Sequence, residues 1–208
     1  MDIQFYGANC LVVTTKQARI VVDDNLTELG KKTITRPGDV IIFTGAHSDP
    51  AVEPKIVINQ PGEYEISGVM IQGIAARGHL EEEGKKGITM YKISSDDLRI
   101  LVVGHVYPEL TDSQLEAIGT VEVMSIPVGG NGYTLDGVGA LKLIKKVEPK
   151  LVIPTHYATK GLNFPMPQRD LDDALQSLAM EPKETSTKLK LKASDVGEGT
   201  QLAILEEV

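Results

Sequence analysis

The sequence predicts a layered α+β sandwich, with β-sheets inside and helices outside. Short β-branched runs separated by turn residues follow one another through the first hundred residues, and helical periodicity begins only after residue 110. Many strands with a few interspersed helices are typical of such a sandwich. Strand patterning alone leaves other α/β or α+β arrangements open. Because the chain has 208 residues and no linker or internal repeat, a single domain over 1–208 is predicted.

The strands are expected where apolar runs lie between turn residues such as the pairs Pro37-Gly38 and Ser67-Gly68. The predicted strands cover 3–6, 10–15, 18–22, 39–43, 55–59, 63–66, 69–75, 88–93, 98–103, 121–126, 151–154, 188–191 and 201–205. Helices are predicted over 111–119, 136–147 and 167–180. The first begins with a capping box, since Thr111 is followed three residues later by Gln114, and Gly119 ends it.

Composition limits the classes of partner. The net charge of −8 argues against nucleic acid, which requires a basic face. A small anionic substrate stays open, because a local cation could reverse the sign inside a pocket. No apolar run approaches the ~20 residues of a membrane span. The one cysteine, Cys10, lies in an apolar run and is interpreted as a buried small hydrophobe. Without a disulfide pattern or signal peptide, we expect a cytoplasmic protein; the sequence does not indicate an oligomeric state.

Several short motifs occur in a specific order. They are Phe5-Tyr6-Gly7, Asp23 after the third strand, Gln60-Pro61-Gly62-Glu63-Tyr64, Leu115-Glu116-Ala117-Ile118-Gly119, Ile126-Pro127-Val128-Gly129-Gly130-Asn131 and Ile153-Pro154-Thr155-His156-Tyr157. With these motifs the chain resembles the metallo-β-lactamase superfamily, in the branch of small zinc-dependent hydrolases related to ascorbate-6-phosphate lactonases. The resemblance implies a four-layer αββα sandwich with a metal site in a cleft at one edge of the two sheets.

The stretch 44–50 resembles the first metal motif of that family, but it is degenerate. Where the family has Thr-His-x-His-x-Asp-His, this chain keeps Thr44, His47 and Asp49. Gly45 and Pro50 stand at the other two histidine positions, and neither has a side-chain ligand atom. The resemblance therefore implies that His47 and Asp49 are metal ligands within an incomplete set.

The remaining histidines also fall at or near family ligand positions. His156 matches the last ligand, His105 occupies the position of an Asp that bridges two metals, and His79 lies near the middle histidine. Each one alone would more often be a surface or hydrogen-bonded histidine than a ligand. Together they indicate a site, although inherited remnants that pack in the cleft without binding anything would give the same pattern.

The chemistry of His105 distinguishes a two-metal from a one-metal site. An imidazole cannot bridge two ions ~4 Å apart as a carboxylate does, so a dinuclear centre is disfavoured. The imidazoles of His47, His105 and His156 would suffice for one catalytic zinc, with Asp49 as a fourth ligand or as the base that orients water. Tyr157 could donate a hydrogen bond to a developing oxyanion. The loop Gly129–Gly132 is either an anion-binding nest or a tight turn.

Two functions follow. The first is a hydrolase with one zinc ion that acts on a small ester, lactone or phosphoester. The second is a catalytically inactive member of the fold, with no metal, that serves as a binding or scaffold module. Metal content separates them.

Overall fold

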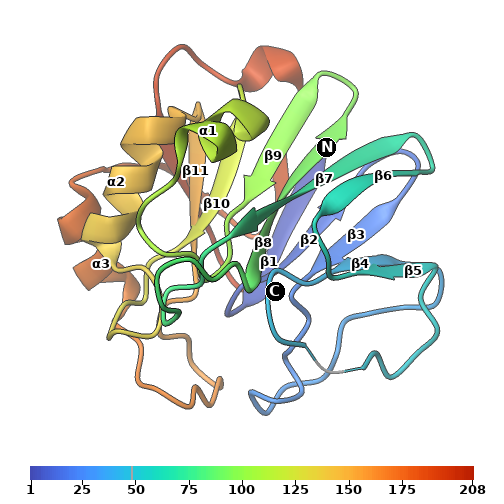
Figure 1. Ribbon diagram of the computed structural model, residues 1–208, viewed down its shortest axis with the longest axis horizontal. Helices are drawn as coiled ribbons and strands as arrows, with labels where there is room; N and C mark the ends of the chain where they lie inside the picture. The colour runs from blue at the N-terminus through green and yellow to red at the C-terminus, as the bar shows by residue number, and fades with distance from the viewer. Residues whose placement is uncertain (48) are drawn as a thin grey trace.

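The computed structural model describes residues 1–47 and 49–208, which form two β-sheets that pack face to face (Figure 1). The six-stranded sheet has the order β13 (Leu189–Lys190), β1 (Asp2–Gly7), β2 (Cys10–Thr14), β3 (Arg19–Val22), β4 (Val40–Ile42) and β5 (Ile56–Ile58). The eight-stranded sheet has the order β12 (Pro182–Ser186), β14 (Gln201–Leu205), β11 (Leu151–Thr155), β10 (Val123–Pro127), β9 (Leu98–Val102), β8 (Ile88–Ser95), β7 (Val69–Ala76) and β6 (Gly62–Ile66).

The two sheets share one apolar core. Fully buried side chains such as Phe5 and Ile20 from the six-stranded sheet belong to the same cluster as Ile71 and Tyr91 from the eight-stranded sheet. Alternation along β1, whose residues are half-buried and buried in turn, explains why only one of its faces contributes to this core. The predicted α+β sandwich is therefore confirmed.

Three α-helices lie beside the eight-stranded sheet: α1 (Asp112–Ile118), α2 (Gly137–Val147) and α3 (Leu171–Leu178) (Figure 1). The capping box of α1 forms as predicted, with Thr111 accepting from the Gln114 amide and the Gln114 side chain accepting from the Thr111 amide. A short 3₁₀ helix, η1 (Ala193–Asp195), precedes β14.

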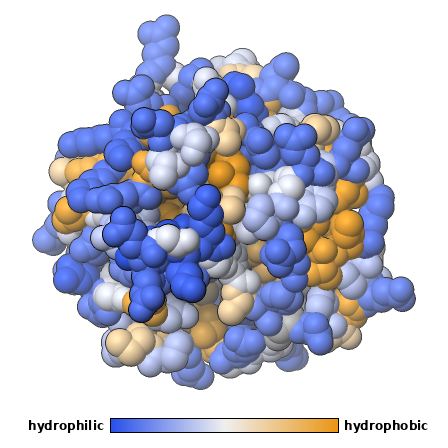
Figure 2. All heavy atoms as spheres, in the orientation of Figure 1, coloured by the Kyte–Doolittle hydropathy of each residue, from blue (hydrophilic) through white to orange (hydrophobic). Residues whose placement is uncertain are grey.

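The outer face of the six-stranded sheet is covered differently. Cys10, Val12 and Val21 on this face pack with Leu26 and Ile34, which belong to the segment 24–38. Among the described residues this segment, rather than an α-helix, forms the outer layer on this side. Cys10 is buried there as a small hydrophobe, as the sequence predicts. In the orientation of Figure 1 the molecular surface is mostly hydrophilic, interrupted by hydrophobic patches (Figure 2).

Two elements differ from the prediction. The third helix begins at Leu171 rather than near 167, because Asp170 caps it by accepting from the Asp173 amide. The strand β12 was not predicted, since its residues Pro182–Ser186 are polar and almost entirely exposed at the edge of the sheet.

Candidate functional site

The carboxyl ends of several strands meet at one edge of the sandwich. In the eight-stranded sheet β9, β10 and β11 are parallel, and β7 runs in the same direction because β8 is antiparallel to both β7 and β9. His79 follows β7, His105 follows β9 and His156 follows β11, so all three histidines come to this edge. They line a cavity of about 540 Å³ that opens between the loops at the ends of the two sheets.

His79 and His105 are held together by backbone pairing. Residues 77–79 and 105–107 form a short antiparallel bridge, in which the His79 amide donates to the His105 carbonyl at 2.8 Å. Gly104, in the turn that follows β9, has a positive φ of 67°. A Cβ there would lie 2.5 Å from Oγ1 of Thr44, so only glycine fits this turn.

His105 and His156 pack ring against ring. Their centroids are 4.4 Å apart with an angle of 83° between the rings, and the Tyr133 ring lies edge-on to His105 at 5.1 Å. The His156 backbone has a positive φ of 53° and its amide donates to Ala8 at 2.7 Å. Ala8 and Asp23 also have positive φ and line the same cavity, and such strain in non-glycine residues is common at functional sites.

The protonation of His156 follows from its neighbour Gln168. The Gln168 amide nitrogen donates to the Met166 carbonyl at 2.7 Å, which fixes Oε1 toward His156 Nδ1 at 3.2 Å. Since this oxygen can only accept, Nδ1 carries the ring proton and Nε2 keeps a lone pair. Burial lowers the pKa of His156 to about 4, so the neutral form prevails at neutral pH.

Burial governs the other two imidazoles as well. It lowers the pKa of His105 to about 3, with further lowering by His156 and His79, and it lowers the pKa of His79. Nδ1 of His79 and Nδ1 of His105 are buried without a hydrogen-bond partner. The cavity therefore holds three neutral imidazoles.

Asp23 and Thr44 form the part of the wall contributed by the six-stranded sheet. They follow the parallel strands β3 and β4, and Thr44 donates its amide and its hydroxyl to the two oxygens of Asp23. Burial raises the pKa of Asp23 to about 6 despite these bonds.

The structure places the other predicted site residues elsewhere. His47 is exposed, stacks on Phe43 with ring centroids 4.6 Å apart, and its Nε2 lies 3.2 Å from Nδ2 of Asn59. Asp49 is exposed, and neither His47 nor Asp49 lines the cavity. Tyr157 is buried against Phe5 at 5.7 Å between centroids, with its hydroxyl 3.4 Å from the Leu205 carbonyl.

The residues present do not fit the dinuclear centre of the family. Within residues 1–47 and 49–208, no three side chains of His, Cys, Asp or Glu are arranged to share a metal ion. A Cβ at Gly45 would lie 2.9 Å from Cδ1 of Ile88, so Ile88 fills the space that a side chain at position 45 would enter. His105, at the position where the resemblance implies a bridging carboxylate, carries a neutral imidazole.

Sequence reasoning missed several residues of this cavity. Asn9, Tyr133 and Phe164 line it and Gln168 orients His156, but each lies in a loop without a recognisable local pattern. Asp23 follows a strand as the site histidines do, and that position is a signal that could have identified it. The loop Gly129–Gly132 is held as a turn, since the Gly130 amide donates to Leu135 and the Gly129 carbonyl accepts from Arg169.

The fold and the position of this cavity define a metallo-β-lactamase-type protein. The chain belongs to the beta-lactamase superfamily, because the model of the Beta-lactamase superfamily domain matches residues 2–156. It is 29% identical to a UPF0173 metal-dependent hydrolase of Salinibacter ruber, over 83% of this chain and 89% of that protein. It is 33% identical to a protein of the same designation from Pyrococcus horikoshii over 47% of this chain and 44% of that one.

Solved structures share the fold. A zinc-dependent hydrolase of the metallo-beta-lactamase superfamily from Thermotoga maritima, so described in its structure report, superimposes with a TM-score of 0.76 at 24% identity, over the whole of both chains. A metal-dependent hydrolase from Parabacteroides distasonis gives a TM-score of 0.68 at 20% identity, over 99% of this chain and 93% of the other.

In the described part of the chain, no helix combines the length and apolar character needed to cross a membrane.

Proposed function

We propose that this protein is a ligand-binding member of the metallo-β-lactamase fold whose cavity takes a small organic molecule and does not build the family's dinuclear metal centre. One observation carries the proposal. The imidazoles of His105 and His156 pack edge to face at 4.4 Å, while His47 and Asp49 lie outside the cavity. His105 and His156 thus contribute uncharged, ring-packed side chains to the wall, and His47 and Asp49 add no charge to it.

The cavity suits a small molecule. Its volume of about 540 Å³ lies within the range of about 300–1,000 Å³ that ligand sites occupy. Its lining combines aromatic rings, such as Phe164 and Tyr133, with a few polar groups, which is the usual composition of such a site. Positive φ at Ala8, Asp23 and His156 supports a functional rather than a purely structural cavity.

A metal-dependent hydrolase with a single zinc ion is the second candidate, acting on an ester, lactone or phosphoester. Two buried nitrogens without partners, Nδ1 of His79 and Nδ1 of His105, favour it. Its ligands would come from His79, His105 and His156, because His47 and Asp49 are exposed outside the cavity. These three imidazoles would have to turn toward one another to share the ion, since the described side chains are not arranged as a metal site. The relatives named as metal-dependent hydrolases support this reaction class.

Elemental analysis of the purified protein separates the candidates. The binding function predicts a small fraction of one equivalent of zinc, iron or manganese, even after reconstitution, and a melting temperature unchanged by a chelator. About one equivalent of metal that is kept in His47→Ala but lost in His105→Gln would establish the second candidate instead. Loss of metal in His47→Ala would identify His47 as a ligand. That result would contradict both the metal-free cavity and the zinc site made of His79, His105 and His156. The cytoplasmic location remains a prediction.

A further inference from the structure

We propose that the cavity selects an uncharged heteroaromatic or similar ring compound that carries both hydrogen-bond donors and acceptors, and that it rejects phosphorylated and carboxylated ligands. This proposal rests on the proposed function, because a metal ion in the cavity would supply the positive charge that the protein lacks there. It identifies the chemical class of the ligand that the cavity binds.

Charge is the first argument. Among the described residues that line the cavity, none is lysine or arginine, whereas Asp23, Glu28 and Glu81 supply carboxyl groups. The nearby Lys31 forms an ion pair with Glu207. A dianionic phosphate entering such a cavity would lose its hydration without gaining a cationic partner, which is unfavourable.

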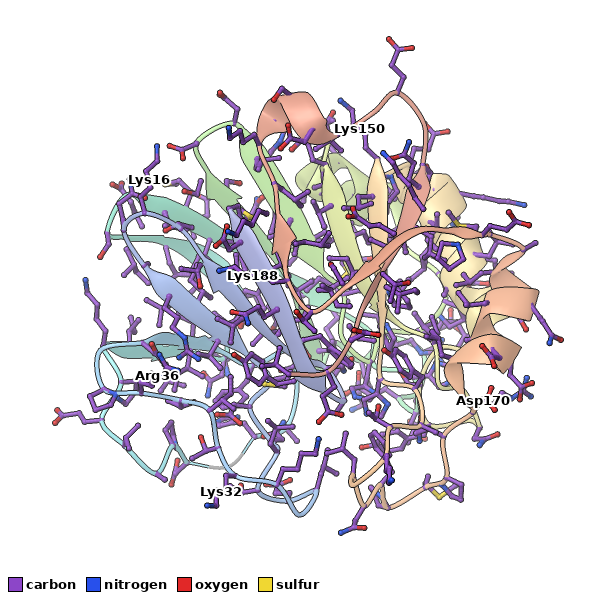
Figure 3. The ribbon with its side chains drawn as sticks, turned by 180° about the vertical axis from the view of Figure 1, so that it is seen from behind. Lys16, Lys32, Arg36, Lys150, Asp170 and Lys188 are labelled. Atoms are coloured by element: carbon purple, nitrogen blue, oxygen red, sulfur yellow. The ribbon has the colours of Figure 1, made fainter. Side chains whose placement is uncertain are left out.

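Lys16 and Lys150 lie far from this cavity, whereas Lys32 lies at the same end of the molecule as the cavity loops (Figure 3). Figure 3 shows Lys16 and Lys150 at the end of the molecule opposite the loops that close it. Lys16 lies in the β2–β3 turn and Lys150 directly precedes β11, so Lys150 is at the amino end of the strand that His156 follows. The glycine loop does not compensate, because the Gly130 amide is already bonded to the Leu135 carbonyl.

Unpaired polar atoms are the second argument. Asn9 is buried and lines the cavity; its Oδ1 accepts from Thr155 at 2.9 Å, and its Nδ2 has no partner. In Asn25 it is the acceptor that is unpaired: its Nδ2 donates to the Ala46 carbonyl, and its Oδ1 has no partner. A buried polar atom without a partner destabilises the fold, because its hydration is lost without replacement.

These atoms form a mixed set. Asn9 offers a donor and Asn25 an acceptor, while Nδ1 of His79 and Nδ1 of His105 serve as either, according to the tautomer. The residues that carry these atoms line the cavity, so a neutral ring compound with N–H and C=O or ring-nitrogen groups suits their mixed polarity. A carboxylate or phosphate, which only accepts, would leave the acceptors of the wall unpaired.

Aromatic lining is the third argument. Tyr133 and Phe164 flank His156, with ring centroids 5.8 Å and 5.0 Å from its imidazole, and Ile88 adds an aliphatic face. Flat aromatic side chains favour a flat ligand, which packs on them over a large area. These half-buried rings, with no lysine or arginine among the described lining residues, give no preference for an anion.

Matched pairs of compounds test the proposal on chelator-treated full-length protein. Each pair is an uncharged heteroaromatic compound and its phosphorylated or carboxylated derivative, with adenosine and adenosine 5′-monophosphate as the first pair and inorganic phosphate added alone. Binding is followed by the ring signals of His105 and His156 in NMR spectra. We expect the neutral members to shift these signals at concentrations at least about tenfold lower than their anionic partners.

A charge variant at the rim sharpens the test. Glu28 is exposed and lines the cavity, so Glu28→Lys should raise affinity for the monophosphate without weakening adenosine. Glu53→Lys makes the same change of charge at an exposed residue outside the cavity and should change neither.

Two results would overturn the proposal: monophosphate or phosphate binding as tightly as the neutral partner, or no neutral ring compound in the panel shifting the histidine signals. Metal content is measured on the untreated protein. A bound metal would therefore contradict the proposed function separately from the charge preference of the metal-free cavity.

Discussion

Both carboxylate oxygens of Asp23 accept hydrogen bonds from Thr44, one from its backbone N–H at 2.7 Å and the other from its hydroxyl at 2.6 Å. The two residues follow neighbouring parallel strands, so these bonds fix the ends of β3 and β4 relative to each other at the cavity wall. Burial nevertheless dominates and raises the pKa of Asp23 to about 6.

This raised pKa predicts a pH-dependent contribution of Asp23 to stability. An unfolded aspartate has a pKa of about 4, so the folded state retains a proton between pH 4 and 6 that the unfolded state has released. The stabilisation is present below pH 4 and is lost as pH rises through 6, by about 2–3 kcal/mol. Asp23→Asn should remove this loss in urea unfolding measured from pH 4 to 7. Asp97→Asn, an exposed control, should leave the pH dependence unchanged.

The buried histidines predict a pH dependence of stability opposite in sign to that of Asp23. Because the folded pKa values of His105 and His156 are about 3 and 4, only the unfolded state takes up protons between pH 6.5 and 4. Stability should fall as pH falls through this range, by a few kcal/mol, and this loss should exceed the gain from Asp23. His105→Gln should flatten the profile, and the exposed His47→Gln should not. An equal slope in the two variants would contradict the burial of His105.

The glycine that precedes His105 predicts a steric effect. Gly104 and Gly132 have nearly the same φ, 67° and 73°, but a Cβ would meet Thr44 at Gly104 and nothing within 4 Å at Gly132. Gly132→Ala should cost about 1 kcal/mol, since its only penalty is the left-handed backbone. Gly104→Ala should cost about 1–3 kcal/mol more. Equal costs, measured by chemical denaturation, would show that Thr44 yields easily.

A histidine introduced at position 45 is expected to conflict with the packing of Ile88. Gly45→His should destabilise the protein, because Cδ1 of Ile88 lies 2.9 Å from the position of the new Cβ. Ile88→Ala is destabilising alone, but it should offset part of the cost in the double variant, with a coupling of about 1 kcal/mol or more. Simple additivity of the two unfolding free energies would contradict the contact. A gain of zinc binding in the double variant would show that Ile88 alone keeps position 45 from serving as a ligand.

The sequence predicted the sandwich because each signal that it used is local. Alternating apolar residues defined strands such as β1, and the pair Thr111 and Gln114 defined the start of α1. The start of the third helix was wrong, since residues 167 and 168 are used in contacts that no local pattern reveals. The Pro167 carbonyl accepts from Asn131, and Gln168 accepts from His156.

The site was predictable only in part for a related reason. His79, His105 and His156 follow strand ends, and parallel strands bring such positions together. His47 instead contacts Phe43 and Asn59 outside the cavity, and sequence spacing does not reveal these tertiary contacts. Asn9 and Phe164 reach the wall through tertiary contacts between loops, so sequence spacing carries no information about them.

The hydrogen bond between Asn9 and Thr155 joins residues 146 positions apart. During translation, which proceeds from the amino terminus, the asparagine emerges long before its partner. Until the segment 155–164 has left the ribosome, Asn9 lacks the hydroxyl of Thr155 that donates to it, and the cavity lacks the ring of Phe164. The wall of this cavity is therefore completed only after residues 155–164 have been synthesised, late in translation.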